Sequence, residues 1–446
     1  MKENSSALFE EAPVWKAIAG MAIPSMVTMM VMILYNLADM YFVGRTGEDA
    51  QVAAVSISAP VFTATMALGS LIGSGGCALI ARLLGEGRRE EVKLCSSLCC
   101  WWSIALGLLL GALILLFPGA VLDILGAKGD ILPHARDYVL LLAPGAAAMI
   151  FSTAFGNIVR AVGAVRQSMV ASLISTAVNL ALDPIFILAM HMGTAGAAVA
   201  TVLGNVAGSA YLIYAVLRGG LPLSLSAREA LRRPFEIWRV MALGLPSAVS
   251  SFMTSFASLF ANRMMVGYGT AAVAAMGAAG KSTRVISMLQ MGLAMGVQPL
   301  MGYCYGAHDR ARLAETLKKL AVLTVGVGCA LSLACLLGSR FVIGLFLEEA
   351  ESLELGREMI RLLVLSGPFL GLFYVSTSFL QSAGRAGAAT LTALLRQGIL
   401  FIPLIYVMNH FFGVTGNICA HLAADLAATA VGCALMLRAY RRRDEK

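Results

Sequence analysis

Long apolar stretches alternate with short polar ones along nearly the whole of this 446-residue chain. Each stretch exceeds the roughly 20 residues that an α-helix needs to cross a bilayer. The stretches are continuous and do not alternate residue by residue, so they predict helices and not the strands of a membrane barrel. They run approximately over residues 13–42, 52–80, 93–118, 132–158, 167–191, 194–217, 236–266, 272–303, 315–339, 356–381, 390–412 and 416–439. The pattern therefore predicts an all-α membrane protein with twelve transmembrane helices.

The composition supports this class of protein and excludes several others. Of the residues, 59% are hydrophobic and only 13% are charged, and the mean hydropathy is +0.81, outside the usual range of soluble domains. The net charge of +8 does not indicate binding to nucleic acid, because the basic residues are scattered between the apolar stretches. The nine cysteines form no C-x-x-C pair, so we predict neither a zinc site nor a disulfide framework. Walker A, G-x-S-x-G and H-E-x-x-H motifs are absent, so we expect neither an enzyme nor an ATP-driven pump.

Lysine and arginine set the predicted orientation. With both termini inside, the inside segments hold 24 of these residues and the outside segments hold six. The other three, Arg263, Lys281 and Arg284, lie within apolar stretches. Because cytoplasmic loops are enriched in basic residues, both termini are predicted to be cytoplasmic. The polar start of the chain does not resemble a cleavable signal peptide, so we expect a multi-pass protein of the plasma (inner) membrane.

The chain repeats itself at a nearly constant offset of almost half its length. Among the matching pairs are Ile23-Pro24-Ser25 with Leu245-Pro246-Ser247, Val43-Gly44 with Val266-Gly267, and Gly193-Thr194-Ala195-Gly196 with Gly413-Val414-Thr415-Gly416. Each half contains six helices, so the two halves have the same orientation and are related by an axis along the membrane normal. We predict an amino-terminal lobe over residues 1–217, a cytoplasmic loop over 218–235 and a carboxy-terminal lobe over 236–446.

Two carboxylates lie within the apolar stretches of the first half. Asp39 follows Tyr35 by four residues, and Asp183 follows Asn179 by four, so each pair shares a helical face. An ionised carboxylate in a bilayer costs a few kcal/mol, so such a residue is a candidate functional site by default. Three neutral polar residues occur on neighbouring helices: Asn157, Thr201 and Asn205.

This polar set supports two kinds of chemistry, and the sequence does not choose between them. Two nearby carboxylates in a desolvated site can take up and release a proton near neutral pH. Alternatively, the oxygens of Asp39, Asn179, Asp183 and Thr201 could surround Na⁺. The simplest structural alternative is that the neutral residues only hydrogen-bond helices together, at about 0.6 kcal/mol each. That alternative explains the carboxylates less well, because their burial is costly.

Several motifs resemble those of the multidrug and toxic compound extrusion (MATE) transporters, and most of all the DinF-like branch. They are the stretch around Asp39 with the Gly-Arg-x-Gly that follows it, Leu-Gly-Glu-Gly at 84–87, Asn157 to Gly163, and Asn179-x-x-x-Asp183-Pro184. The resemblance covers essentially the full chain. It implies a V-shaped pair of six-helix lobes that needs no cofactor and exports organic, often cationic, compounds in exchange for H⁺ or Na⁺. It also implies that Asp39, Asn179, Asp183 and Thr201 form the ion site, with Tyr35 and Asn157 in the surrounding hydrogen-bond network.

The second half departs from this pattern. Asn262 occupies the position that corresponds to Asp39, and Ile402-Pro403 stands where Asp183-Pro184 would repeat. We therefore expect ion coupling to be concentrated in the first lobe. Asp425, the counterpart of Asn205, has His421 four residues earlier, and the two are secondary candidates. Lys281 and Arg284 are the cations expected to neutralise Asp425.

Pro24 interrupts the first apolar stretch and removes a backbone hydrogen bond, so it is a candidate hinge. Its repeat partner Pro246 is similarly placed, so an architecture inherited from the duplication explains the proline equally well. The sequence as a whole predicts a secondary active exporter of multiple drugs, associated with antibiotic resistance, that works by alternating access. We expect it to be a monomer with small-molecule substrates and membrane lipids as its partners. A flippase for lipids or lipid-linked saccharides of related architecture and an ion channel remain as alternatives. Only Arg263, Lys281 and Arg284 could supply the cationic cavity that a flippase needs.

Overall fold

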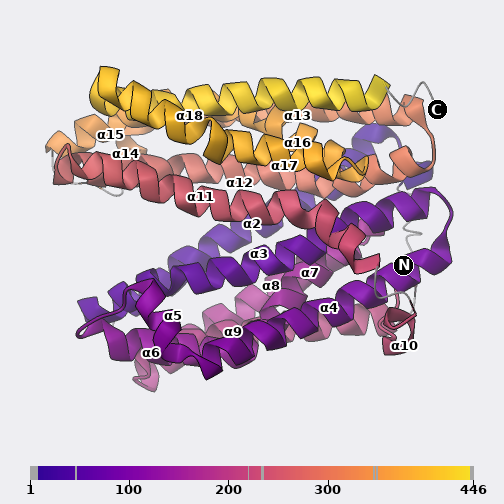
Figure 1. Ribbon diagram of the computed structural model, residues 1–446, viewed down its shortest axis with the longest axis horizontal. Helices are drawn as coiled ribbons and strands as arrows, with labels where there is room; N and C mark the ends of the chain where they lie inside the picture. The colour runs from indigo at the N-terminus through magenta and orange to yellow at the C-terminus, as the bar shows by residue number, and fades with distance from the viewer. Residues whose placement is uncertain are drawn as a thin grey trace. The chain divides into compact units, whose positions relative to one another are not determined.

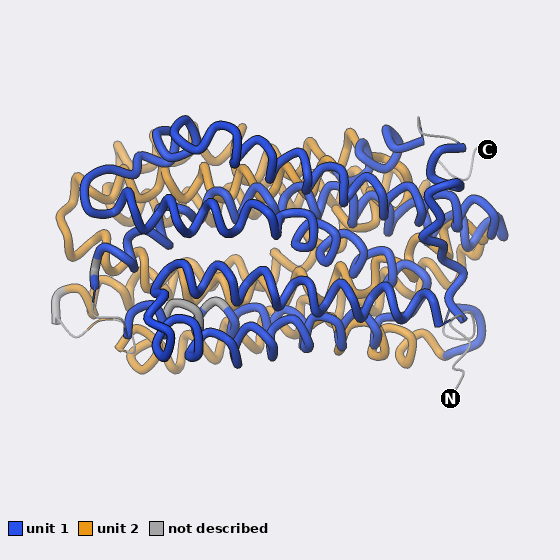
Figure 2. The backbone as a smooth tube through the Cα atoms, turned by 90° about the horizontal axis from the view of Figure 1, so that it is seen from below, with its two compact units in different colours: residues 1–12, 27–244 blue, residues 13–26, 245–446 orange. Residues whose placement is uncertain are grey.

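The computed structural model describes residues 9–45, 48–218, 220–232, 236–344, 347 and 350–441. Over these residues, the regular secondary structure is entirely helical (Figure 1). The chain divides into two compact units, shown in different colours in Figure 2. Unit 1 consists of residues 1–12 and 27–244, and unit 2 of residues 13–26 and 245–446. The division into lobes at 217 and 236 stays a prediction.

The helices of the first half begin with α2 and those of the second half with α11. The first set is α2 (Val14–Gly44), α3 (Asp49–Gly85), α4 (Arg89–Leu116), α5 (Pro118–Leu125), α6 (Ile131–Leu142), η1 (Ala143–Gly145), α7 (Ala146–Ala161), α8 (Val165–Asp183), η2 (Pro184–Ala189), α9 (Gly193–Leu217) and α10 (Ala227–Ala230). The second set is α11 (Ile237–Val266), α12 (Thr270–Gly306), α13 (Arg310–Leu337), α14 (Ser339–Gly344), α15 (Ala350–Leu363), η4 (Val364–Ser366), α16 (Gly367–Ser382), α17 (Ala386–Leu394), η5 (Leu395–Ile399) and α18 (Phe401–Arg441).

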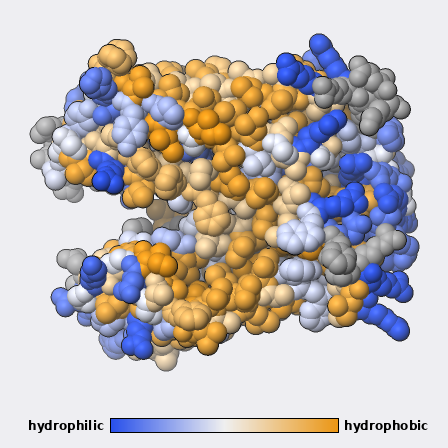
Figure 3. Space-filling model, in the orientation of Figure 1, coloured by the Kyte–Doolittle hydropathy of each residue, from blue (hydrophilic) through white to orange (hydrophobic). Residues whose placement is uncertain are grey.

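The described residues contain 11 helical runs that are long and apolar enough to cross a membrane. The last run, Ala386–Arg441, has 56 residues, more than twice the length that a single crossing needs. Gly413 interrupts α18 with non-helical torsion angles (φ 58°, ψ −135°) and splits this run into two spans. In each unit, hydrophobic residues cover the middle of the helices and hydrophilic residues gather at their ends (Figure 3). The predicted all-α membrane fold with twelve crossings is thus confirmed.

The backbone shows the same repeat as the sequence. Positive φ angles occur in pairs, at Gly163 (83°) with Gly384 (75°) and at Gly87 (75°) with His308 (60°). Both pairs keep the offset found in the sequence. Each marks a tight cytoplasmic turn by our predicted orientation. The 3₁₀ segments η1 and η4 also interrupt corresponding helices, between α6 and α7 and between α15 and α16.

The motif at residues 84–87 forms one of these turns. Arg82 Nε donates to Glu86 Oε1 at 2.8 Å, and Arg88 Nη1 donates to Glu86 Oε2 at 2.9 Å. Partial burial raises the pKa of Glu86, but the hydrogen bonds from Arg88 and Arg82 outweigh it, so the pKa lies below its usual value. The motif therefore stabilises the connection between α3 and α4.

Glycines let helices of unit 1 approach closely. A Cβ atom on Gly107 would lie 2.3 Å from the Ala147 Cα, and one on Gly111 would lie 2.4 Å from the Ala143 carbonyl oxygen. Small residues at such contacts are typical of membrane helices, where packing replaces the hydrophobic effect as the main attraction. Larger side chains fill the core beside them, and the rings of Phe151 and Phe155 stack 5.0 Å apart.

The first helix of each repeat is shared between the units. Residues 13–26, at the start of α2, belong to unit 2, and residues 237–244, at the start of α11, belong to unit 1. Within unit 1, a Cβ atom on Gly75 would lie 1.9 Å from the Val240 carbonyl oxygen. Within unit 2, one on Gly296 would lie 2.8 Å from the Met21 carbonyl oxygen. Gly75 and Gly296 occupy equivalent positions in the two halves, so the exchange follows the repeat.

Two basic residues that the sequence placed in cytoplasmic segments are buried. Arg160 lies in α7 with 7% of its surface exposed, and Arg396 lies in η5 with 9% exposed. Arg160 lies in the last turn of α7 and Arg396 within η5, and each has a polar partner there. Their location in the inside segments stays a prediction. Without them the basic residues still favour the inside segments strongly, so the predicted orientation is unaffected.

Candidate ion-coupling site

Asp183 is the last residue of α8, where the helix passes into the π-helical segment η2. Pro184 follows it and cannot donate a backbone hydrogen bond, so the regular α-helical pattern ends there. The Asp183 side chain is fully buried, and Asn179, one turn earlier, is 2% exposed. In the amide orientation that satisfies both of its polar groups, Asn179 Nδ2 donates to Asp183 Oδ2 at 3.3 Å. The Asn179 oxygen then accepts from the Thr201 backbone amide at 3.2 Å.

Helices α2 and α9 contribute the neighbouring oxygens. Thr201 in α9 is 1% exposed, and its Oγ1 lies 3.0 Å from Tyr35 Oη of α2 in a hydrogen bond. Asn205, one turn further along α9, donates from Nδ2 to the Thr201 carbonyl oxygen at 2.9 Å. The structure therefore brings together Tyr35, Asn179, Asp183 and Thr201, with Asn205 at the edge of the group.

Two predicted site residues are not placed in this group. Asp39 belongs to α2, one turn after Tyr35, but its side chain lies outside the described part of the structure. Asn157 in α7 donates to the Thr153 carbonyl oxygen at 2.8 Å and accepts from Arg160 Nη2. Among the described residues, the hydrogen bonds of Asn157 thus run along its own helix.

The group offers one buried carboxylate surrounded by amide and hydroxyl groups. A fully buried carboxylate needs compensating interactions, and a bound proton or a small cation can be one of them. Oxygen ligands of this kind suit hard cations such as Na⁺, and the same carboxylate can carry a proton. The geometry is compatible with both ions.

A double-mutant cycle tests the link between Tyr35 and Thr201. We expect Tyr35→Phe and Thr201→Val each to weaken the ion dependence of transport slightly, because each removes the same hydrogen bond. The coupling between the two substitutions should be about 0.6 kcal/mol, or roughly threefold in the half-saturating ion concentration. Efflux measured at several ion concentrations for the four variants gives this number. Strictly additive effects would show that the bond plays no part.

Unit 2 contains a different charged group. Arg396 Nε donates to Asp425 Oδ1 at 2.7 Å, which joins η5 to α18. The expectation that Lys281 or Arg284 would neutralise Asp425 was wrong, because Arg396 does so and the other two are exposed residues of α12. His421 packs its ring on Phe401 at 4.3 Å, and its buried Nε2 has no hydrogen-bond partner among the described residues. Arg396 could have been noticed in the sequence, since it lies well inside the apolar stretch 390–412.

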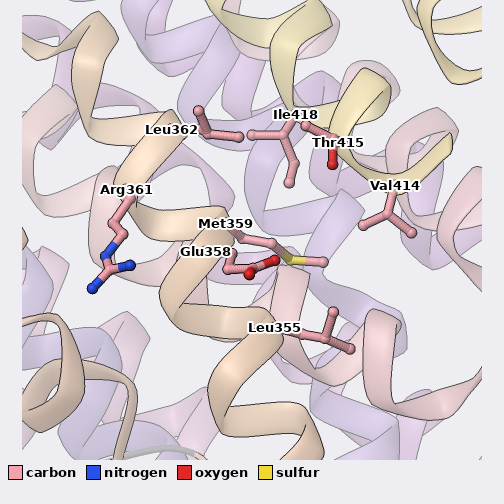
Figure 4. A pocket seen from close by; sticks show the side chains of 8 residues that line it. All are labelled: Leu355, Glu358, Met359, Arg361, Leu362, Val414, Thr415 and Ile418. Carbon is pink, nitrogen blue, oxygen red and sulfur yellow. The ribbon is translucent and has the colours of Figure 1, made fainter. Parts of the chain in front are cut away.

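A cavity of about 280 Å³ opens in unit 2 between α15 and α18 (Figure 4). Its walls are mainly apolar, and the Arg361 side chain extends away from the α18 residues (Figure 4). The lining residues are Leu355, Glu358, Met359, Arg361, Leu362, Val414, Thr415 and Ile418. Among the predicted site residues whose side chains the structure describes, none lines this cavity.

The MatE family model matches the chain twice, over residues 24–185 and 246–407. The two matches together cover more than half of the chain, and their starting points are offset as the repeat requires. The chain belongs to the MatE family. The predicted resemblance is confirmed, and so is the expectation that the protein is not an enzyme, because MatE proteins are membrane transporters. Its assignment to the DinF-like branch stays a prediction.

Several relatives match this MatE protein over nearly the full length of both chains. The multidrug export protein MepA of Staphylococcus aureus (strain MSSA476) is 29% identical over 448 residues, which cover 100% of this chain and 97% of MepA. MepA of Staphylococcus saprophyticus subsp. saprophyticus is 28% identical over 444 residues, with the same coverage. A solved structure, the outward-facing conformation of a multidrug resistance MATE family transporter of the MOP superfamily, is 25% identical. It matches with a TM-score of 0.91 and covers 100% of this chain and 99% of its own.

Proposed function

We propose that this MatE protein exports organic compounds, many of them cations, from the cytoplasm in exchange for H⁺, with Na⁺ as the alternative coupling ion. The observation that carries the proposal is Asp183, a fully buried carboxylate whose neighbours Asn179 and Thr201 are neutral polar groups. Such a group can take up and release a small cation as its access changes. The names of the relatives, which are multidrug export proteins, support the class of substrate.

The contrast between the two units supports coupling through the first lobe. In unit 2, Asp425, the counterpart of Asn205, is bonded to Arg396. Its negative charge is therefore compensated by the protein itself. Asp425 is therefore a weaker candidate for ion coupling than the two carboxylates predicted from the sequence, Asp39 and Asp183. We place the ion site in lobe 1–217 of a plasma-membrane protein with both termini in the cytoplasm.

Efflux from proteoliposomes tests the function. The purified protein is reconstituted with ethidium inside, and a pH gradient and a sodium gradient are imposed separately. We expect the pH gradient to drive efflux. Efflux driven by sodium alone would indicate that the oxygens around Asp183 bind Na⁺. We propose that no cofactor is needed in either case. If neither gradient moves the dye while the protein is folded, the proposal fails and a lipid-linked substrate becomes the better hypothesis.

The proposed hinge lies at Pro24 in α2. Proline lacks a backbone N–H and its ring crowds the preceding turn, and Ser25 Oγ bonds back to the Met21 carbonyl oxygen at 2.9 Å, which also favours bending. The boundary between units 2 and 1 falls two residues later, between Met26 and Val27. The corresponding boundary in α11 falls beside Pro246. We infer that α2 bends at Pro24 when the ion site changes its occupancy.

Pro24→Ala should therefore slow transport severalfold without lowering stability, because alanine restores the missing helical hydrogen bond. The measurement is the initial rate of ethidium efflux together with the unfolding temperature. Pro60→Ala in α3 is the matched control, since it also replaces a proline inside a helix. Normal transport with unaltered ion dependence in Pro24→Ala would rule out the hinge.

A further inference from the structure

The guanidinium group of Arg396 occupies a site whose chemistry suits an organic cation. Arg396 Nε donates to Asp425 Oδ1 at 2.7 Å, and Nη1 donates to Tyr374 Oη at 3.2 Å. The guanidinium carbon also lies 4.9 Å from the centre of the Phe373 ring and 5.4 Å from that of Tyr374. A carboxylate beside two aromatic rings is the arrangement by which proteins recognise quaternary ammonium and other lipophilic cations.

The residues that follow Arg396 in η5 contact the neighbouring helix α11. Gly398 in η5 lies close to Met253 of α11, since a Cβ atom on it would be 3.3 Å from the thioether sulfur. Gln397 accepts a hydrogen bond from Thr254 Oγ1 at 2.6 Å. These contacts pack η5 against α11.

Arg396 lies in a segment whose backbone departs from the regular α-helix. It lies in the π-helical segment η5, where the Leu400 amide bonds to the Leu395 carbonyl oxygen at 3.2 Å, five residues back. Such segments are common at functional sites, because the helix can return to the α-helical register and turn its side chains. The side chains of Arg396 and Asp425 are 9% and 13% exposed, so the pair is not sealed off.

We propose that Arg396 is a tethered substitute for the transported cation. It fills the site formed by Asp425, Tyr374 and Phe373 while no ligand is present, and an organic cation takes its place when the guanidinium group moves out. This inference rests on the proposed function for the nature of the ligand. The exchange between Arg396 and the ligand has a physical advantage, because Asp425 is paired with a positive charge at all times. A buried carboxylate without a counter-charge would be strongly unfavourable.

Ligand binding to the purified full-length protein tests the substitution. Binding of tetraphenylphosphonium is measured for the wild type, Arg396→Gln, and Arg396→Gln combined with Asp425→Asn. In the wild type, only the fraction of molecules whose guanidinium group has moved out can bind the ligand, and this fraction limits the apparent affinity. Arg396→Gln makes every molecule competent, so tetraphenylphosphonium should bind about tenfold more tightly. The double variant should lose this gain. The control Arg284→Gln removes the same charge from an exposed position in the same unit and should bind like the wild type.

A purely structural ion pair predicts no gain in affinity. If Arg396 only ties η5 to α18, Arg396→Gln binds tetraphenylphosphonium no more tightly than the wild type, and the proposal is wrong. If wild-type vesicles also fail to export any cation, the proposed function has failed as well. The two failures are distinct, because export by the wild type does not depend on the binding comparison.

A second measurement covers the case in which Arg396→Gln does not fold. Arg396→Ala leaves a space beside Asp425 that methylguanidinium can fill. We expect millimolar methylguanidinium to raise the unfolding temperature of Arg396→Ala, or its yield of folded protein, and to leave the wild type unchanged. Addition of Asp425→Asn should abolish the effect. If Arg396→Ala gains nothing from methylguanidinium, the site does not accept a free cation and the proposal is overturned.

Discussion

Asp183→Asn is expected to reduce gradient-driven efflux to the level of protein-free vesicles. The substitution keeps the shape of the side chain and its contact with Asn179, but it removes the negative charge that a proton or Na⁺ would neutralise. The neutral amide and hydroxyl groups around Asp183 cannot replace its negative charge, so ion coupling should be lost. Efflux of ethidium from proteoliposomes under the gradient that drives the wild type measures the loss. Asp39→Asn should behave in the same way if the two carboxylates act together.

Asp123→Asn is the matched control, because Asp123 is an exposed carboxylate of α5 in the same unit. It should transport like the wild type. The unfolding temperature of Asp183→Asn should stay near or above that of the wild type, since a charge buried at a cost has been removed. Substantial driven efflux by Asp183→Asn would exclude Asp183 as the coupling residue.

Gly75→Ala is expected to be among the most damaging substitutions of a single small residue in this protein. The new Cβ atom would lie 1.9 Å from the Val240 carbonyl oxygen and 2.7 Å from the Gly244 backbone nitrogen, so α3 and the start of α11 would have to separate. Overpacking against side chains usually costs about 1–3 kcal/mol, and here the obstacle is backbone that cannot rotate away. We expect a large loss of folded protein or an unfolding temperature well below that of the wild type.

The control for this prediction is Gly277→Ala in α12. A Cβ atom at Gly277 meets nothing within 4 Å, and alanine favours a helix over glycine by about 1 kcal/mol. Gly277→Ala should therefore be as stable as the wild type or more so. The comparison is made by thermal unfolding in the same detergent. Equal stability of the two variants would mean that α3 and α11 do not approach as closely as described.

Hydropathy predicted the crossings well, because every transmembrane helix must contain enough consecutive apolar residues to cross the bilayer. The helix ends were less predictable, and α3 runs to Gly85 where the apolar stretch ends near residue 80. The last turn of α3 extends beyond the apolar stretch, and hydrogen bonds from Arg82 and Arg88 to Glu86 hold the turn that follows. Local pairing of this kind leaves no mark on a hydropathy profile.

The site was only partly readable for a related reason. A spacing of four residues placed Asn179 beside Asp183 and Thr201 beside Asn205, because helix geometry fixes those neighbours. It could not show that Tyr35 of α2 would bond to Thr201 of α9, or that Asn157 would face away from this group. Contacts between helices depend on their rotation and depth, which the periodicity within one helix does not determine.

The shared first helices also affect how the protein is made. Residues 13–26 belong to unit 2, yet more than half of the chain must be synthesised after Ser25 before Gly296, its close neighbour there, exists. At roughly 5–20 residues per second, that takes about 15 to 55 s. During this time the start of α2 is inserted without its final neighbours, so the nascent amino-terminal half is not a finished folding unit. The ribosome, the insertion machinery or the surrounding lipid must keep this segment accessible until the second half emerges.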